Sequence, residues 1–160
     1  MAQRIPEIPR PPRPSPLQYG DVERARRFRE FLESHRGESH LAALQDYPDP
    51  DAIASAMAYR IMADRFDIDV DIVYEGRVSH QENLALVHLL DIELTRYTES
   101  LPLDRYAGAV YIDNQGTTTH LTDRLEAAGV HPLAISDHHA PQGVVEAGFS
   151  DIRRVGAAAT

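Results

Sequence analysis

Short apolar runs alternate with longer amphipathic segments along most of this chain. The apolar runs have the length of buried strands and occupy residues 40–44, 70–75, 108–113 and 132–136. The intervening segments have the length and apolar spacing of helices and occupy residues 52–66, 79–90 and 117–129. Strands that alternate with helices of this length predict βαβ units. The pattern therefore predicts an α/β fold, a mostly parallel sheet with helices on both faces.

The N-terminal part of the chain follows a different pattern. Residues 1–18 are rich in proline and carry three arginines against one glutamate, which predicts a disordered tail. A helix is expected over residues 21–37, with Asp21 as its N-cap and Gly37 at its end. Residues 19–160 are then expected to form one α/β domain, since their number suits a single hydrophobic core.

Composition narrows the chemistry that this domain can use. The chain has no cysteine, so any metal ion must be held by carboxylates and imidazoles, which suit Mg²⁺, Mn²⁺, iron or zinc. The net charge of −9 argues against broad binding to a phosphate backbone through basic surface. No apolar run approaches membrane-spanning length and no signal peptide is visible, so we expect a cytoplasmic protein without a membrane partner.

Acidic and imidazole side chains follow three of the predicted strands. They are Asp49 and Asp51 after the first strand, Asp113 at the end of a central strand, and Asp137, His138 and His139 at the end of the next. Ligands of parallel α/β sheets bind beyond the carboxyl ends of the strands, and adjacent strands lie less than about 5 Å apart. Carboxylates gathered there would repel one another unless divalent cations lay between them.

Each of these residues also has a purely structural interpretation. Asp-Pro-Asp is common in turns, and Asp51 could be the N-cap of the following helix. Asp113 alone could cap a loop, and paired histidines are often simply exposed. Their shared position at three strand ends favours a metal site.

Three motifs in the same places resemble a known family. The stretches "PDPDAIAS", "YIDNQG" and "SDHHAP" are similar to the first three motifs of the DHH phosphoesterases. That superfamily includes RecJ-type exonucleases, NrnA-like nanoRNase/pAp phosphatases, exopolyphosphatases and family II pyrophosphatases. The similarity runs from about Leu41 to the C-terminus and includes "YEGRVSHQENLALVHLLDIEL", which looks like the stretch after the second strand of bacterial NrnA-like members.

The resemblance implies a centre of two Mn²⁺ ions, with Mg²⁺ as the alternative. Carried over to this chain, Asp49 would bind the first ion and Asp51 the second, while Asp113 would bridge them. His138 would bind the second ion, with Asp137 orienting it. Such a pair of ions activates a water molecule for attack on a phosphoester.

The resemblance also implies the substrate contacts. His139 would face the substrate phosphate, which makes His139 and Asp113 the candidate catalytic residues. Helix N-termini near Ala52 and Thr117 could add partial positive charge. The implied activity is hydrolysis of short oligonucleotides or small nucleotides such as pAp. The sequence leaves the oligomeric state open, a homodimer included.

Two departures from the family pattern favour an alternative. Gln45 stands where many members have a metal-binding histidine, and a neutral amide beside the site would hold the first ion more weakly. The similarity also covers only the N-terminal part of the DHH domain, so that the fourth motif and the C-terminal substrate domain have no counterpart in residues 19–160. The alternative is a metal- or nucleotide-binding module without catalytic turnover.

Overall fold

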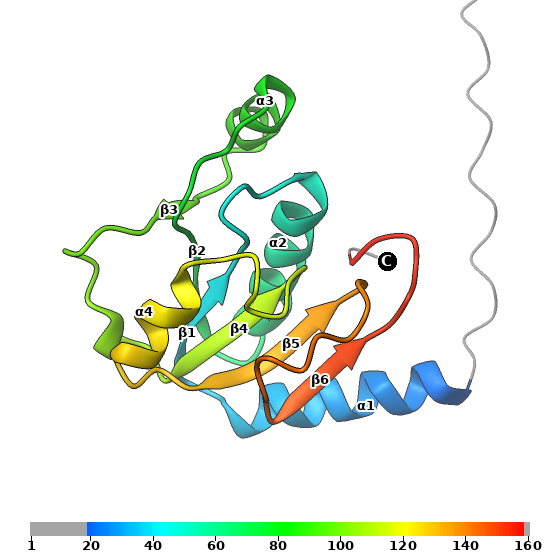
Figure 1. Ribbon diagram of the computed structural model, residues 1–160. Coiled ribbons are helices and arrows are strands. Elements are labelled where there is room, and N and C mark those ends of the chain that lie inside the picture. The colour runs from blue at the N-terminus through cyan, green and yellow to red at the C-terminus, as the bar shows by residue number, and fades with distance from the viewer. Residues whose placement is uncertain (1–18, 159–160) are drawn as a thin grey trace, which may run out of the picture.

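The structure, a computed structural model, describes residues 19–158, so the predicted tail over residues 1–18 lies outside the described range. Its centre is a six-stranded sheet (Figure 1). The strands are β1 (Ser39–Ala43), β2 (Asp69–Tyr74), β3 (Thr95–Arg96), β4 (Gly108–Ile112), β5 (Pro132–Asp137) and β6 (Phe149–Ile152). All neighbouring strands are parallel, in the order β3-β2-β1-β4-β5-β6. The predicted α/β class with a parallel sheet is confirmed.

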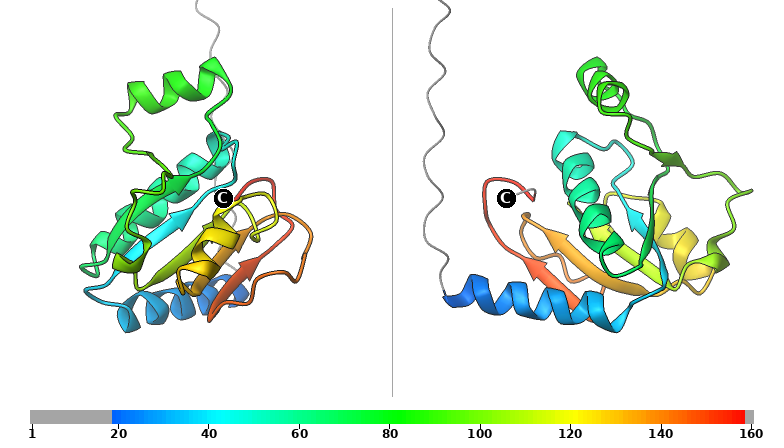
Figure 2. Two further views of the ribbon diagram at one scale, coloured as in Figure 1. Left: turned by 60° about the vertical axis from the view of Figure 1, so that its left-hand side comes forward. Right: turned by 180° about the vertical axis from the view of Figure 1, so that it is seen from behind.

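Helices cover both faces of this sheet, as predicted (Figure 2). They are α1 (Tyr19–Ser34), α2 (Pro50–Asp64), α3 (Gln81–Leu89) and α4 (Leu121–Ala127), with a short 3₁₀ helix η1 (Leu103–Arg105). Helices α1 and α2 pack on one face, whereas α4 and η1 pack on the other. Helix α3 lies beyond the carboxyl ends of the strands (Figures 1 and 2), and its Leu86 and Val87 are half-buried against the core on the α2 side. No helix within residues 19–158 has both the length and the hydropathy to cross a membrane.

The central strands are buried because both sheet faces are covered. Every residue of β4 is buried, as expected for a middle strand of a parallel sheet. In β1, Ala42 packs toward α1 and α2, while its neighbours Leu41 and Ala43 belong to the core beneath α4. The continuous apolar runs seen in the sequence therefore serve two hydrophobic cores at once.

The strand order creates a switch point between β1 and β4. From β1 the chain passes through α2 to β2 on one side, whereas β4 is followed by α4 and β5 on the other side. In such sheets the connections diverge at this point and leave a crevice beyond the carboxyl ends, where ligands bind. Asp49 follows β1 and Asp113 follows β4, so both lie beside this point.

Several element boundaries differ from the expected ones. Helix α1 begins at Tyr19, so Asp21 lies in its first turn instead of capping it. Helix α4 begins at Leu121 and not at Thr117, because the preceding residues form a loop in which Thr122 Oγ1 donates a hydrogen bond to the Gly116 carbonyl over 2.7 Å. The predicted helix N-terminus at Thr117 is therefore wrong. Strands β3 and β6 and the helix η1 were not predicted.

Candidate metal centre

The turn after β4 presents Asp113 to the carboxyl edge of the sheet. Asp113 has a φ of 57°, in the left-handed region that aspartate and asparagine tolerate better than most residues. The next side chain, Asn114, donates hydrogen bonds to the carbonyls of Ala43 (3.0 Å) and Ile112 (2.9 Å) and accepts one from the Gly116 amide (3.0 Å). These bonds fix the turn between the ends of β1 and β4, so the Asp113 carboxylate has a defined position.

Side chains from three strand ends meet there. His138 Nε2 lies 3.2 Å from Asp113 Oδ1 and 3.4 Å from Asp51 Oδ2. His139 Nδ1 lies 3.9 Å from the same Asp113 oxygen. We call these four residues, Asp51, Asp113, His138 and His139, the carboxyl-edge cluster. The structure thus brings together side chains that the sequence placed after β1, β4 and β5.

Asp113 is the most constrained acid of the cluster. Its side chain is 1% exposed, and within residues 19–158 its Oδ1 atom is buried without a hydrogen-bond donor in bonding geometry. Burial, followed by the negative charges of Asp49 and Asp51, raises the pKa of Asp113 to about 6, although His138 and His139 act in the opposite direction. A buried carboxylate oxygen without a hydrogen bond, beside an imidazole nitrogen and a second carboxylate, suits a divalent cation.

Asp137 holds the two histidines in place. Its Oδ1 accepts hydrogen bonds from the backbone amide of His138 (2.8 Å) and from Nδ1 of His139 (2.7 Å). The orienting contact that we expected for the His138 ring therefore falls on the His139 ring. Burial alone would raise the pKa of Asp137, but hydrogen bonds from Gln115 and His139 outweigh it and lower that pKa. The hydrogen bond with Asp137 in turn raises the pKa of His139.

Gln115 supports this arrangement and was missed in the sequence. Its buried Nε2 donates hydrogen bonds to Asp137 Oδ2 (2.7 Å) and to the Ala140 carbonyl (3.1 Å), while its Oε1 accepts one from the Gln142 amide (2.8 Å). Gln115 therefore ties the loop after β4 to the loop after β5. The signal that could have identified it is a pair of amide side chains directly after a buried apolar strand, in "YIDNQG".

Asp49 has a structural contact as well as a position near the cluster. Its Oδ1 accepts a hydrogen bond from the Ala52 amide (2.9 Å), so Asp49 and not Asp51 is the N-cap of α2. The Ala52 amide therefore already donates to the Asp49 carboxylate and does not point unpaired at a ligand, in contrast to the exposed amide expected at that helix end. Asp51 Oδ2 accepts a hydrogen bond from the Ala158 amide (2.7 Å) in addition to its contact with His138.

The residues just after β1 differ in what they contact. Gln45 is half-buried, and among the described residues none forms a hydrogen bond with its side chain. Asp46 is buried; its Oδ1 accepts a hydrogen bond from the His120 amide (3.1 Å), and its Oδ2 pairs with the His120 ring. The Asp46 carbonyl also accepts a bond from the Arg77 amide (2.8 Å). Asp46 therefore joins loops of the scaffold.

Most of the chain is similar in sequence to a known protein. Over 114 residues, or 71% of its length, the chain is 40% identical to the uncharacterized protein MJ1633 of Methanocaldococcus jannaschii. The chain spans 22% of the length of that relative. It matches no protein-family model.

A solved structure has the same architecture. An exopolyphosphatase-related protein from Bacteroides fragilis superposes with a TM-score of 0.65 and 18% identity, over 86% of this chain and 41% of that one. The chain is thus an α/β protein with the fold of a phosphatase-related protein.

Proposed function

We propose that this chain forms the metal-binding half of a phosphoesterase of the DHH type. The observation that carries the proposal is the meeting of Asp51, Asp113 and His138 from three strand ends at the switch point of the sheet. The three motifs that resemble the DHH phosphoesterases supply these same residues. The fold shared with an exopolyphosphatase-related protein agrees with this assignment.

The cation ligands of the proposal are Asp49, Asp51, Asp113 and His138. Bound Mn²⁺ or Mg²⁺ supplies the positive charge that lowers the pKa of a water molecule and stabilises phosphoryl oxygens. The buried Asp113 oxygen, which receives no hydrogen bond from the described residues, fits this role. Asp49 Oδ1 is the cap of α2, which leaves its other oxygen for an ion.

His139 is the substrate-binding residue of the proposal. Its side chain is 52% exposed, and Asp137 holds its Nδ1, so Nε2 is left for a ligand. Because Asp137 raises the pKa of His139, the ring carries positive charge over a wider pH range than a free imidazole. A cationic imidazole at this place would bind and orient a phosphate group.

The proposed substrates are short oligonucleotides or small nucleotides such as pAp. The net charge of −9 gives the molecule little attraction for a long phosphate backbone, so recognition depends on the local site. The residues that line the substrate pocket would come from outside the stretches that resemble the DHH motifs.

A hydrolysis assay with a matched variant tests the proposal. The chain would be incubated with Mn²⁺ and either a dinucleotide or pAp, and phosphate or mononucleotide release would be measured for wild type and Asp113→Asn. We expect Mn²⁺-dependent release by the wild type and a large loss in the variant. Equal turnover by the two proteins, or turnover unaffected by a chelator, contradicts the proposal.

The neutral side chain of Gln45 and the capping bond of Asp49 favour a second candidate function. Gln45 brings no charge to the site, and one Asp49 oxygen is already used as a helix cap. Such a site could bind metal and nucleotide without turnover. Calorimetry that shows Mn²⁺-dependent nucleotide binding, together with no product even at high protein concentration, would favour this binding module.

A further inference from the structure

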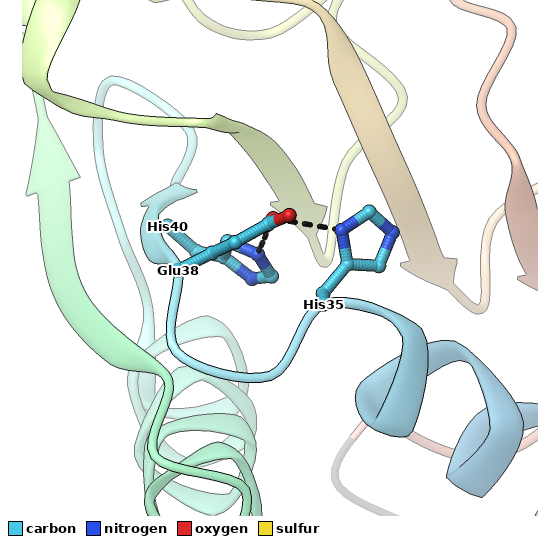
Figure 3. Close-up of side chains that lie close together, drawn as sticks. All are labelled: His35, Glu38 and His40. Carbon is cyan, nitrogen blue, oxygen red and sulfur yellow. Dashed lines mark hydrogen bonds and ion pairs between the residues drawn. The ribbon is translucent and has the colours of Figure 1, made fainter.

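A second group of metal-ligating side chains lies at the opposite edge of the sheet. His35 follows the end of α1, Glu38 precedes β1, and His40 is the second residue of β1 (Figure 3). One ligand atom from each of the three lies within 4.8 Å of the others. We call His35, Glu38 and His40 the amino-edge cluster.

Both imidazoles point at one carboxylate oxygen, as Figure 3 shows. His35 Nδ1 lies 2.8 Å and His40 Nε2 lies 3.2 Å from Glu38 Oε2. In a tetrahedral zinc site with bonds of about 2.0–2.2 Å, neighbouring ligand atoms lie roughly 3.3–3.6 Å apart. The two distances to Glu38 Oε2 are somewhat shorter than this, and the two imidazole nitrogens lie within 4.8 Å of each other, so the side chains would move slightly apart to admit an ion among the three atoms.

Hydrogen bonds fix the backbone of residues 35–40, so the proposed ligands are in place before a metal ion binds. The Glu38 amide donates a hydrogen bond to the His35 carbonyl (3.2 Å), and the Glu38 carbonyl accepts one from Asp69 (2.9 Å). Gly37, at a φ of 81°, donates its amide to the Phe66 carbonyl (3.3 Å). These bonds tie the turn to the segment that leads into β2, and preorganised ligands bind metals more tightly.

A buried tyrosine provides the outer contact that metal-binding histidines require. His40 is fully buried, and its Nδ1 lies 2.7 Å from the Tyr59 hydroxyl on α2. A hydroxyl can donate or accept, so Tyr59 can serve either tautomer of the ring. When Nε2 binds a metal, Nδ1 carries the proton and donates a hydrogen bond to the hydroxyl oxygen, which fixes the ring.

The amino-edge cluster is accessible from solvent, and its donor atoms suit a divalent cation. The His35 and Glu38 side chains are 23% and 35% exposed, so an ion and a water ligand can reach the open side of the cluster. Two imidazoles with one carboxylate form a borderline donor set that prefers Zn²⁺ to Mn²⁺. The amino-edge cluster and the carboxylate-rich carboxyl-edge cluster therefore differ in the metal that they favour.

We propose that His35, Glu38 and His40 form a structural site for one zinc-class divalent ion, which joins the end of α1 to the start of β1. The site is separate from the proposed phosphoesterase centre, because the two clusters lie at opposite ends of β1. The ion would stabilise the packing of α1 on the sheet, since His35 follows that helix and His40 is buried in the core.

The test uses Co²⁺ and Zn²⁺ with a protein whose carboxyl-edge cluster has been disabled by Asp113→Asn and His138→Gln. We expect this protein to take up one Co²⁺ with a tetrahedral visible absorption band and to melt at a higher temperature as Zn²⁺ is added. Because outer contacts alone change metal affinity by about 10–100-fold, loss of a direct ligand through His35→Gln or Glu38→Gln should weaken Zn²⁺ binding by at least about 100-fold. The matched control is His88→Gln, an exposed histidine on α3.

Two results would overturn the proposal. One is Zn²⁺ binding of unchanged affinity after His35→Gln and Glu38→Gln, in variants whose circular dichroism shows a native fold. The other is a zinc-edge anomalous difference map of the wild-type protein with zinc that shows no peak among His35, Glu38 and His40. The map needs no substitution, because it uses the wild-type protein. It shows separately whether zinc is bound at the carboxyl-edge cluster, so the absence of metal at one site is distinguishable from its absence at the other.

Discussion

Gln115 Nε2 lies 2.7 Å from Asp137 Oδ2 and joins the loop after β4 to the end of β5. Through this bond a neutral amide sets the position of the carboxylate that holds His139. The bond also contributes to the lowered pKa of Asp137, against the effect of burial. Gln115 therefore acts on the carboxyl-edge cluster without belonging to it.

Replacing Gln115 by leucine should weaken the site more than the fold. Asp137 would lose one hydrogen-bond donor, so its pKa should rise. Its hydrogen bond with the His139 ring should then weaken. Asp137 also accepts the backbone amide of His138, a proposed metal ligand, so by analogy with other outer contacts we expect Mn²⁺ affinity or turnover to fall by about 10–100-fold. The measurements are Mn²⁺ calorimetry and the hydrolysis assay. The control Gln142→Ala keeps the backbone amide that bonds to Gln115, so it should retain wild-type values; equal behaviour of both variants contradicts the assignment.

Asp113→Asn should stabilise the metal-free protein at neutral pH. The pKa of Asp113 rises from its ordinary 3.8 to about 6 in the folded state, so the folded protein binds this proton more tightly than the unfolded chain. Stability from this group is therefore greatest below about pH 4 and is lost as the pH rises through 6, at a cost of at most about 3 kcal/mol. Asparagine tolerates the same left-handed backbone and has no charge to desolvate.

Urea unfolding in a chelator at pH 5 and pH 7.5 measures this effect. The wild type should lose stability relative to Asp113→Asn between the two pH values, and Mn²⁺ should restore it in the wild type only. The exposed Asp104→Asn serves as the control for a change of net charge. A variant that is less stable than the wild type at pH 7.5 without metal contradicts the prediction.

Two substitutions of Asp49 should separate its capping contact from its charge. Asparagine is as good an N-cap as aspartate, whereas alanine costs about 1 kcal/mol of stability. We expect Asp49→Asn to unfold like the wild type and Asp49→Ala to unfold at lower urea concentration. Both should bind Mn²⁺ less tightly, which calorimetry measures. Unchanged Mn²⁺ affinity in both variants would show that Asp49 is only the N-cap of α2 and not a metal ligand.

The contact between Asp46 and His120 should make stability depend on pH. Hydrogen bonding to Asp46 raises the pKa of His120 above its ordinary 6.5 in the folded state. The contribution is therefore complete below pH 6.5 and disappears as the pH rises through the higher folded-state pKa. The stability difference between wild type and His120→Gln should be larger at pH 6 than at pH 9 in urea titrations, whereas His131→Gln, an exposed histidine, should show no such change. A constant difference would contradict this.

The sequence predicted the parallel sheet and the residues at its carboxyl edge because both follow from local patterns. Buried central strands such as β4 are continuous apolar runs, and a parallel sheet brings the next residue of each strand to one edge. Asp51, Asp113 and His138 accordingly lie together as expected. Their roles as metal ligands stay predictions.

Other features depend on contacts between distant segments that no local pattern contains. Strand β3 has only two residues and β6 has four, so neither has enough length for a periodic signal. Whether Asp49 or Asp51 caps α2 depends on the conformation of one residue before the helix. The amino-edge cluster spans a helix end, a turn and a strand, so its three side chains have no shared periodicity.

The bonds of Asn114 would also act during ion exchange at the proposed metal centre. They are neutral hydrogen bonds to the main chain of β1, β4 and Gly116, so their strength does not depend on a bound cation. Emptying the carboxyl-edge cluster would leave the turn in the same place. If the carboxyl-edge cluster binds metal as proposed, one kind of ion could therefore be exchanged for another according to supply, without refolding of the turn between the two events.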